Sequence, residues 1–240
     1  MNDLILYVHG AGGSAAESAH YRPLFPNDEV LGLDYPTAAP WEAANALHAA
    51  VEALKQEHAH ITLIANSIGA FFSMIAGIDG MLRRAYLISP IVDMERLICG
   101  MMLRAGVTEA ELEARGVIRA DSGETLSWAY LCYVRSHPVR WTVPTSILCG
   151  AGDELTSLET VRAFAERQNA DLTVMENGEH WFHTDEQMQV FGQLAQGTRA
   201  APACMILAAK FLRPMTIGNR RSGSLCPETI RLRAFVWRRA

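Results

Sequence analysis

The chain has 240 residues, half of them hydrophobic and 20% charged, a composition typical of a globular protein with one sizeable core. It lacks the basic start and long apolar centre of a signal peptide, and no uninterrupted apolar stretch approaches the roughly 20 residues of a membrane-spanning helix. We therefore expect a cytoplasmic protein without a membrane span. The cysteines are scattered, so we expect reduced thiols rather than disulfides or a zinc site: Cys99, Cys132, Cys149, Cys204 and Cys226.

The net charge of −5 conceals an asymmetry between the body of the chain and its end. Residues 1–197 hold 12 Lys and Arg against 25 Asp and Glu, a net −13, whereas residues 198–240 hold 9 against 1, a net +8. We therefore divide the chain into one domain, residues 1–196, and a basic tail, residues 197–240, with the composition of a disordered arm. Three interpretations of the tail stay open: it binds nucleic acid or an anionic membrane, it lies against the acidic body, or it is not native coding sequence.

Strands and helices alternate through the first part of the chain. Leu4–Val8 is a continuous apolar run of strand length that ends in the glycine-rich loop His9–Ser14. Val30–Leu33 predicts a second short strand, and Trp41–His58 spaces its apolar residues three and four apart, as an amphipathic helix does. Ile61–Ala65 predicts another buried strand.

The alternation resumes in the last part of the domain. A helical stretch runs from Ser67 to about Gly77. The remaining strands are predicted at Ala85–Ile88, Thr145–Cys149 and Leu172–Met175, and the remaining helices at about Leu158–Gln168 and Asp185–Ala195. This order predicts an α/β fold, a mostly parallel sheet flanked by helices and joined by right-handed crossovers. Ligands of such sheets bind at the carboxyl ends of the strands.

Residues 92–142 break the alternation. They show helical spacing at Met94–Leu103 and Glu109–Ala114 but no convincing strand, so we predict a small helical cap over the sheet. The Met and Leu residues of the cap either line an apolar substrate pocket or serve as plain packing, and the sequence leaves both open.

A serine lies on the predicted turn between a strand and a helix. Ser67 follows the strand Ile61–Ala65, and small residues stand two positions to either side of it, at Ala65 and Gly69. The pattern is typical of the nucleophile elbow G-x-S-x-G, here with Ala in place of the first Gly, because crowding at the turn requires small side chains. The alternative is a serine that only caps the helix that follows.

A serine nucleophile needs a base to take its proton and a carboxylate to orient the base, and in this fold class they follow the serine in the order Asp or Glu, then His. Asp153 comes just after the strand Thr145–Cys149, and His180 just after the strand Leu172–Met175. Both therefore belong at the same carboxyl edge of the sheet as Ser67. A loop Asp or a lone His is usually structural, but together the three indicate a Ser-His-Asp triad.

Two neighbouring residues are alternatives for the base and the acid. His183 is expected at the start of the last helix, whereas His180 lies on a loop from which its ring can reach both partners. For the acid, Glu154 is likewise an alternative to Asp153. We assign the base to His180 and the acid to Asp153.

The tetrahedral intermediate of acyl transfer needs two N–H groups aimed at its oxyanion. Ile68, the residue after the nucleophile, is expected to give one, and Ala11, in the glycine-rich loop after the first strand, the other. That loop lacks the Lys-Ser/Thr ending of a P-loop and the spacing of a dinucleotide fingerprint, which argues against nucleotide binding.

In these motifs the chain resembles the α/β-hydrolase superfamily, over about Leu4–Leu194. The segments that carry the resemblance are His9-Gly10 with its following glycines, Ala65–Gly69, Gly150–Asp153 and Gly178–Trp181. The early His-Gly loop is similar to that of compact single-domain members without the usual leading strands. The tail from about Gly197 departs from the family.

The resemblance implies a serine hydrolase that cleaves an ester or related acyl bond of a small molecule through an acyl-enzyme, with no cofactor and no metal. We expect no nucleic acid partner for the domain. Esterases, lipases, thioesterases, peptidases and acyltransferases share this family, so the acyl chain and the leaving group stay open, as does the oligomeric state. The competing interpretation is a hydrolase-like fold that serves as a small-molecule receptor or interaction protein with little turnover, although an intact triad weighs against it.

Overall fold

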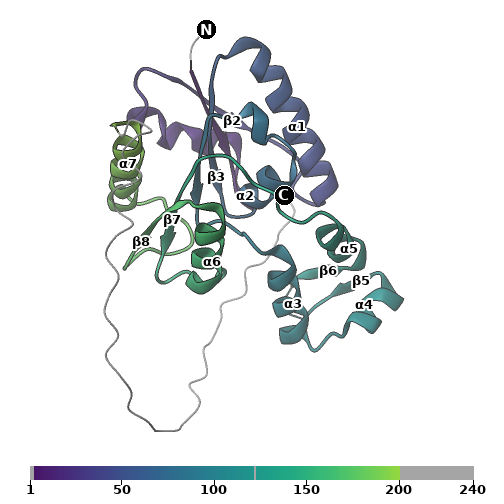
Figure 1. Cartoon of the computed structure of the whole chain (residues 1–240). Helices are drawn as coiled ribbons and strands as arrows, with labels where there is room; N and C mark the ends of the chain where they lie inside the picture. The colour runs from purple at the N-terminus through teal and green to yellow at the C-terminus, as the bar shows by residue number, and fades with distance from the viewer. Residues whose placement is uncertain (1–2, 122, 201–240) are drawn as a thin grey trace, which may run out of the picture.

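The structure is a computed structural model, and it describes residues 3–121 and 123–200. Its centre is a six-stranded sheet in the order β2-β1-β3-β4-β7-β8, with every neighbouring pair parallel (Figure 1). The strands are β1 (Leu4–Val8), β2 (Glu29–Leu33), β3 (Ile61–Asn66), β4 (Arg84–Ile88), β7 (Thr145–Gly150) and β8 (Asp171–Met175). The predicted α/β fold with a mostly parallel sheet is confirmed.

Alternate residues of each strand face opposite sides of the sheet and build two separate cores. In β1, Leu4, Leu6 and Val8 belong to the larger core, while Ile5 and Tyr7 belong to the smaller one. All five side chains are at most 1% exposed, because a strand covered on both faces has no side open to solvent. This double burial explains the unbroken apolar run that marks the strand in the sequence.

Helices cover both faces of the sheet. Side chains of α1 (Pro40–Glu57), α2 (Ile68–Ile75) and α6 (Leu158–Gln168) join the larger core, whereas those of α7 (Asp185–Ala200) join the smaller one. Figure 1 shows α1 and α7 on opposite sides of the sheet. The two helical layers leave the carboxyl edge of the sheet as the place where loops can gather.

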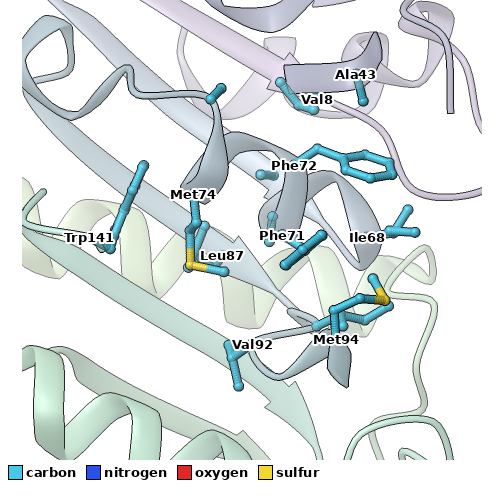
Figure 2. Packing of buried hydrophobic residues seen from close by; sticks show 14 of the residues in the cluster. Val8, Ala43, Ile68, Phe71, Phe72, Met74, Leu87, Val92, Met94 and Trp141 are labelled. Atoms are coloured by element: carbon cyan, nitrogen blue, oxygen red, sulfur yellow. The ribbon is translucent and has the colours of Figure 1, made fainter. Parts of the chain in front are cut away.

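The short helix α2 is buried on nearly all sides, since the residues from Ile68 to Met74 are all buried. Figure 2 shows Phe71 and Met74 of this helix among the packed side chains around Leu87 of β4 and Met94 of the cap. The sheet, α1 and Met94 thus pack around the helix that begins directly after Ser67. This packing fixes the direction in which the helix leaves the strand.

The expected cap contains strands that the sequence analysis did not predict. It consists of α3 (Met94–Ala105), α4 (Glu109–Arg115), an antiparallel pair of strands β5 (Val117–Arg119) and β6 (Thr125–Ser127), and α5 (Trp128–Ser136). The expectation of no strand between residues 92 and 141 was therefore wrong. Each strand has only three residues, with one buried side chain each, Ile118 or Leu126, which is too short to show an alternating pattern.

A charged cluster and an aromatic contact hold α5 in place within the cap. Arg135 of α5 donates hydrogen bonds to Glu95 of α3 at 2.7 Å and to Glu109 of α4 at 2.6 and 2.8 Å. The ring of Tyr133 meets that of Trp41, in the first turn of α1, edge to face at 5.7 Å between centroids. The cap is thereby joined to the main domain through α1.

The last helix extends further than the sequence predicts. α7 runs to Ala200 rather than to about Ala195, and it passes residue 197, where we expect the basic tail to begin. Residues 201–240 lie outside the described part of the chain, so the division into domain and tail stays a prediction. Among the described helices, none is long and apolar enough to cross a membrane.

Candidate active site

Ser67 is the one residue between β3 and α2, and its backbone forms a strained turn. Its backbone has φ 54° and ψ −121°, a conformation that costs a residue with a Cβ on the order of 1–3 kcal/mol. The turn is held by hydrogen bonds on both sides: the Ser67 N–H donates to the Ile88 carbonyl at 3.0 Å, and the Ile91 N–H donates to the Ser67 carbonyl at 3.1 Å. This backbone conformation places the Ser67 hydroxyl beyond the end of β3, as the elbow pattern predicts.

The loop after β1 packs directly against this turn. A Cβ placed on Gly69 would lie 2.4 Å from the carbonyl oxygen of His9, so only glycine fits there. A Cβ on Gly10 would lie 3.1 Å from the Cβ of Ser67. The small residues on both segments therefore let two backbones approach each other, and the glycine-rich loop lies beside the hydroxyl of Ser67.

The three side chains singled out in the sequence form one chain of hydrogen bonds. The Oγ of Ser67 lies 2.8 Å from Nε2 of His180, and Nδ1 of His180 lies 2.8 Å from Oδ2 of Asp153. The other carboxylate oxygen, Oδ1, accepts from the N–H groups of Leu155 and Thr156 at 2.9 and 3.2 Å. The Asp153 side chain is 3% exposed and that of His180 19%, so the carboxylate is enclosed while the ring remains accessible.

The loops that carry Asp153 and His180 contact each other through their backbones. The Gly152 N–H donates to the Gly178 carbonyl at 3.0 Å. A Cβ on Gly150 would lie 2.0 Å from that same carbonyl oxygen, so glycine is required here as well. This contact holds the loops of Asp153 and His180 together independently of the two side chains.

The alternative residues lie away from this chain of hydrogen bonds. His183 lies just before α7; its Nδ1 is 2.8 Å from the Trp181 carbonyl, and its ring stacks on that of Trp181 at 3.9 Å. Glu154 is exposed, and Asp153 rather than Glu154 contacts the histidine.

The two expected oxyanion donors belong to the two segments that meet at Ser67, the start of α2 and the loop after β1. Ile68 is the first residue of α2, where a backbone N–H has no acceptor within its own helix. Ala11 lies in the exposed turn that follows His9 and Gly10. Their role as oxyanion donors stays a prediction.

Tyr35, which lies two residues beyond the end of β2, also belongs to this site, although its sequence context did not single it out. Its hydroxyl donates to the His9 carbonyl at 2.6 Å, and its ring lies 4.7 Å from that of His9. The His9 carbonyl is thus enclosed between the Tyr35 hydroxyl and Gly69. The position of Tyr35 after a predicted parallel strand was a usable signal, since such positions gather at the carboxyl edge.

Burial keeps the phenols of Tyr35 and Tyr130 and the thiol of Cys149 protonated. Desolvation raises the pKa of Tyr35 far above its ordinary value, and the neighbouring phenol of Tyr130 adds to that shift. Burial likewise raises the pKa of Tyr130. Burial and the charge of Asp153 raise the pKa of Cys149 to about 11, so this thiol is neutral near pH 7. The tyrosines are therefore available as hydrogen-bond donors throughout the neutral range.

Comparisons with known proteins place the fold. No protein-family model matches the chain, and a search of curated proteins finds no match. The chain is similar to the solved structure of Est1E from Butyrivibrio proteoclasticus, with 17% identity over 82% of this chain and 87% of that one and a TM-score of 0.66. It is also similar to mouse α/β hydrolase domain-containing protein 10, with 14% identity, 82% and 89% coverage and a TM-score of 0.66. A thermophilic esterase, Est2 of Thermogutta terrifontis, matches with 17% identity, 82% coverage of both chains and a TM-score of 0.53.

Replacing Gly69 by alanine tests the close contact under the nucleophile turn. Inside a helix, Gly→Ala normally adds about 1 kcal/mol of stability. Here we expect Gly69→Ala to lower the free energy of unfolding by about 1–3 kcal/mol, because the new methyl group collides with the His9 carbonyl. Urea denaturation followed by circular dichroism measures the change. Gly80→Ala is the control, since its Cβ meets nothing within 4 Å, and equal effects of the two variants would contradict the contact.

Proposed function

Because this chain has the α/β-hydrolase fold, we propose that it is a serine hydrolase that cleaves an ester or related acyl bond through an acyl-enzyme. The observation that carries the proposal is the hydrogen-bonded chain from Ser67 through His180 to Asp153, with 2.8 Å at each link. In this arrangement one ring nitrogen faces the hydroxyl and the other faces a carboxylate, as general-base activation of a serine requires.

The proposed reaction proceeds in two acyl transfers. Nδ1–H of His180 donates to Asp153, which leaves Nε2 as the acceptor for the proton of Ser67. As Oγ attacks the substrate carbonyl, His180 takes that proton and then gives it to the departing alkoxide or thiolate, so the alcohol or thiol leaves and the acyl group stays on Oγ. Water then attacks the acyl-enzyme, again losing its proton to His180, and the acid is released as Oγ regains the proton.

The negative oxygen of each tetrahedral intermediate is assigned to the backbone N–H groups of Ile68 and Ala11. Two features support this assignment. The Ile68 N–H is at the amino end of a buried helix, where the helix dipole favours negative charge. The loop that bears Ala11 is in contact with the nucleophile turn through Gly10, which brings its backbone to the side of Ser67.

The substrate class proposed is a small carboxylic ester or thioester. Among the similar structures, Est1E was solved with ferulic acid bound, and the Thermogutta esterase with butyrate bound. The Thermogutta enzyme was also solved phosphoramylated by tabun. Small acids and a phosphorylating agent thus occupy proteins of this fold, which supports an ester as the substrate and an organophosphorus probe as the test.

Replacing Ser67 by alanine tests the assignment of the nucleophile. The natural protein is expected to gain one fluorophosphonate adduct at Ser67, because His180 activates that hydroxyl. Intact-mass spectrometry with peptide mapping measures it. Ser67→Ala should gain none and should lose hydrolysis of p-nitrophenyl esters by at least about 10⁴-fold.

Ser73→Ala is the matched control for Ser67→Ala, since Ser73 is a buried serine of α2, the helix that follows Ser67, and its hydroxyl donates to the Gly69 carbonyl. It should label normally. An adduct at another residue, or undiminished turnover by folded Ser67→Ala, would contradict the proposed nucleophile.

Alanine variants of His180 and His183, two histidines three residues apart, test which of them is the general base. His180→Ala is expected to lower kcat by at least about 10⁴-fold, because no other described ring nitrogen lies within hydrogen-bonding distance of the Ser67 hydroxyl. His183→Ala should change kcat no more than about twofold, because its ring contacts Trp181 instead. Steady-state kinetics on one p-nitrophenyl ester measures both. Losses of equal size in two folded variants would reopen the choice of base.

Removing the Tyr35 hydroxyl tests whether the loop after β1 must be held in place. Tyr35→Phe is expected to lower kcat about tenfold with KM changed less than about twofold, because the His9 carbonyl loses its anchor and the oxyanion donor beside it shifts. Affinity for a boronic acid transition-state analogue should fall in parallel with kcat.

Tyr86→Phe is the control for Tyr35→Phe, since Tyr86 is a buried tyrosine on the other face of the sheet whose hydroxyl also reaches a backbone carbonyl, that of Ala195 at 3.4 Å. A change confined to KM, or the same kinetic loss in both variants, would count against a positioning role for Tyr35.

A further inference from the structure

Both ends of the loop after β1 are attached to the end of β2. The loop begins after His9, whose carbonyl accepts a hydrogen bond from the Tyr35 hydroxyl at 2.6 Å. It ends at Ala15, whose N–H donates to Oδ1 of Asp34 at 2.7 Å. Asp34 and Tyr35 are the first two residues after β2. Two adjacent residues at one strand end therefore hold the two ends of the loop.

The Asp34 carboxylate takes the place of a helix cap at Ala15. Ala15 is the first residue of the 3-10 helix η1 (Ala15–His20), and the first N–H groups of a helix have no acceptor within it. The residue before it, Ser14, makes no capping hydrogen bond with its side chain. Hydrogen bonds from an N–H to a carboxylate are roughly twice as strong as those between neutral groups. Asp34 thus supplies this acceptor from 19 residues further along the chain.

Two further contacts bring the same strand end against the loop. A Cβ placed on Gly32 would collide with the Ala15 carbonyl, so the backbone of β2 touches that residue directly. Oδ1 of Asp34 also lies 3.9 Å from Nε2 of His9, a residue that is 4% exposed. Asp34 therefore lies between the two residues that flank the loop and is close to both.

The tip of the loop has few contacts of its own. Neither Ala11 nor Gly12 makes a hydrogen bond with another described residue, and the adjacent bond runs from the Gly13 N–H to the Gly10 carbonyl at 3.2 Å. A Cβ on Gly12 would meet nothing within 4 Å. The N–H of Ala11 is thus unpaired in the described part of the chain. Its position depends on how the two ends of the loop are held.

We propose that Asp34 is a positioning residue of the hydrolytic site. Its hydrogen bond to the Ala15 N–H fixes the end of the loop that presents the Ala11 N–H to the oxyanion. This inference rests on the proposed hydrolase function. An oxyanion donor acts only when it is placed about 3 Å from the negative oxygen, and a misplacement of about 1 Å can cost about 100-fold in rate. Holding only the Tyr35 end of the loop would leave its other end free to move.

Two substitutions of Asp34 separate its hydrogen bond from its charge. Asp34→Ala removes the acceptor of the Ala15 N–H, whereas Asp34→Asn keeps an oxygen for that bond and removes the charge. Steady-state kinetics on one p-nitrophenyl ester gives kcat and KM, with the folded sites counted by complete fluorophosphonate labelling. The Ki of a boronic acid, which forms a tetrahedral anion on the serine, reports on the oxyanion site itself.

Asp34→Ala is expected to lower kcat about tenfold and to change KM less than about twofold, because the oxyanion forms in the transition state and not in the bound ester. The Ki of the boronic acid should rise about tenfold in parallel. Asp34→Asn should stay within about threefold of the natural protein in both quantities, because the amide oxygen accepts the same hydrogen bond.

Asp79→Ala is the matched control. Oδ2 of Asp79 accepts from the Thr142 N–H at 3.2 Å and so joins two segments 63 residues apart, as Asp34 joins two segments. Asp79 precedes β4 and Thr142 precedes β7, so this bond lies at the amino edge of the sheet, away from Ser67. The control variant should change kcat and the boronic acid Ki less than about twofold.

The outcomes distinguish this inference from the function on which it rests. An unchanged kcat in Asp34→Ala, a change confined to KM, or equal losses in Asp34→Ala and Asp34→Asn would overturn the positioning role while leaving the hydrolase intact. An equal kinetic loss in Asp79→Ala would overturn it as well, since the effect would then be one of general stability. Absence of turnover of every ester by the natural protein would contradict the hydrolase function itself.

Discussion

The contact between the loop after β1 and the turn after β3 is the constraint on which the rest of the candidate site depends. Gly69 allows the His9 carbonyl to approach the first turn of α2, and Gly10 allows the loop to lie against Ser67. The strained backbone of Ser67 is maintained because the neighbouring segments pack on both sides of it. Without this contact the serine would be an ordinary helix cap.

A second backbone contact, between Gly150 and Gly178, does the same for Asp153 and His180. Side chains on loops are ordinarily free to adopt several rotamers, which would separate Asp153 from His180. Here the backbones of the two loops are in direct contact with each other. Two further backbone N–H groups donate to the carboxylate of Asp153 and hold it in place. The site therefore depends on close approach at glycines more than on any single side-chain interaction, which is the preorganisation that electrostatic catalysis requires.

Much of the fold was predictable because its signals are local. Buried parallel strands such as Leu4–Val8 are continuous apolar runs, and the order of Ser67, Asp153 and His180 after three such strands suffices to bring them to one edge. The resemblance to the α/β-hydrolase fold is confirmed by the solved structures of similar shape. The sequence analysis did not find β5 and β6, because three residues cannot display a period. It also missed Tyr35, whose role arises from a contact 26 residues away in the chain.

The cap is held together and joined to the rest of the domain by polar contacts, an aromatic contact and apolar packing. Its helices are joined to one another by the hydrogen bonds of Arg135, which are exposed and individually worth little. Its contact with α1 is made by the rings of Trp41 and Tyr133. The buried side chains of the cap, among them Leu112 and Leu131, also belong to the same apolar core as side chains of the sheet, so cap and sheet are packed together.

The separation of Ser67 and His180 by 113 residues has a consequence for folding. Contacts between distant parts of a chain form slowly, because the loop between them must be closed before the contact contributes any stability. β8, which precedes His180, lies at the edge of the sheet, and among the described strands it pairs only with β7. A chain that has built β1, β3, β4 and α2 thus has an elbow but no base. Under the proposed mechanism, hydrolysis becomes possible only once the far edge of the sheet has been added, so enzymatic activity would report on the completion of folding rather than on its onset.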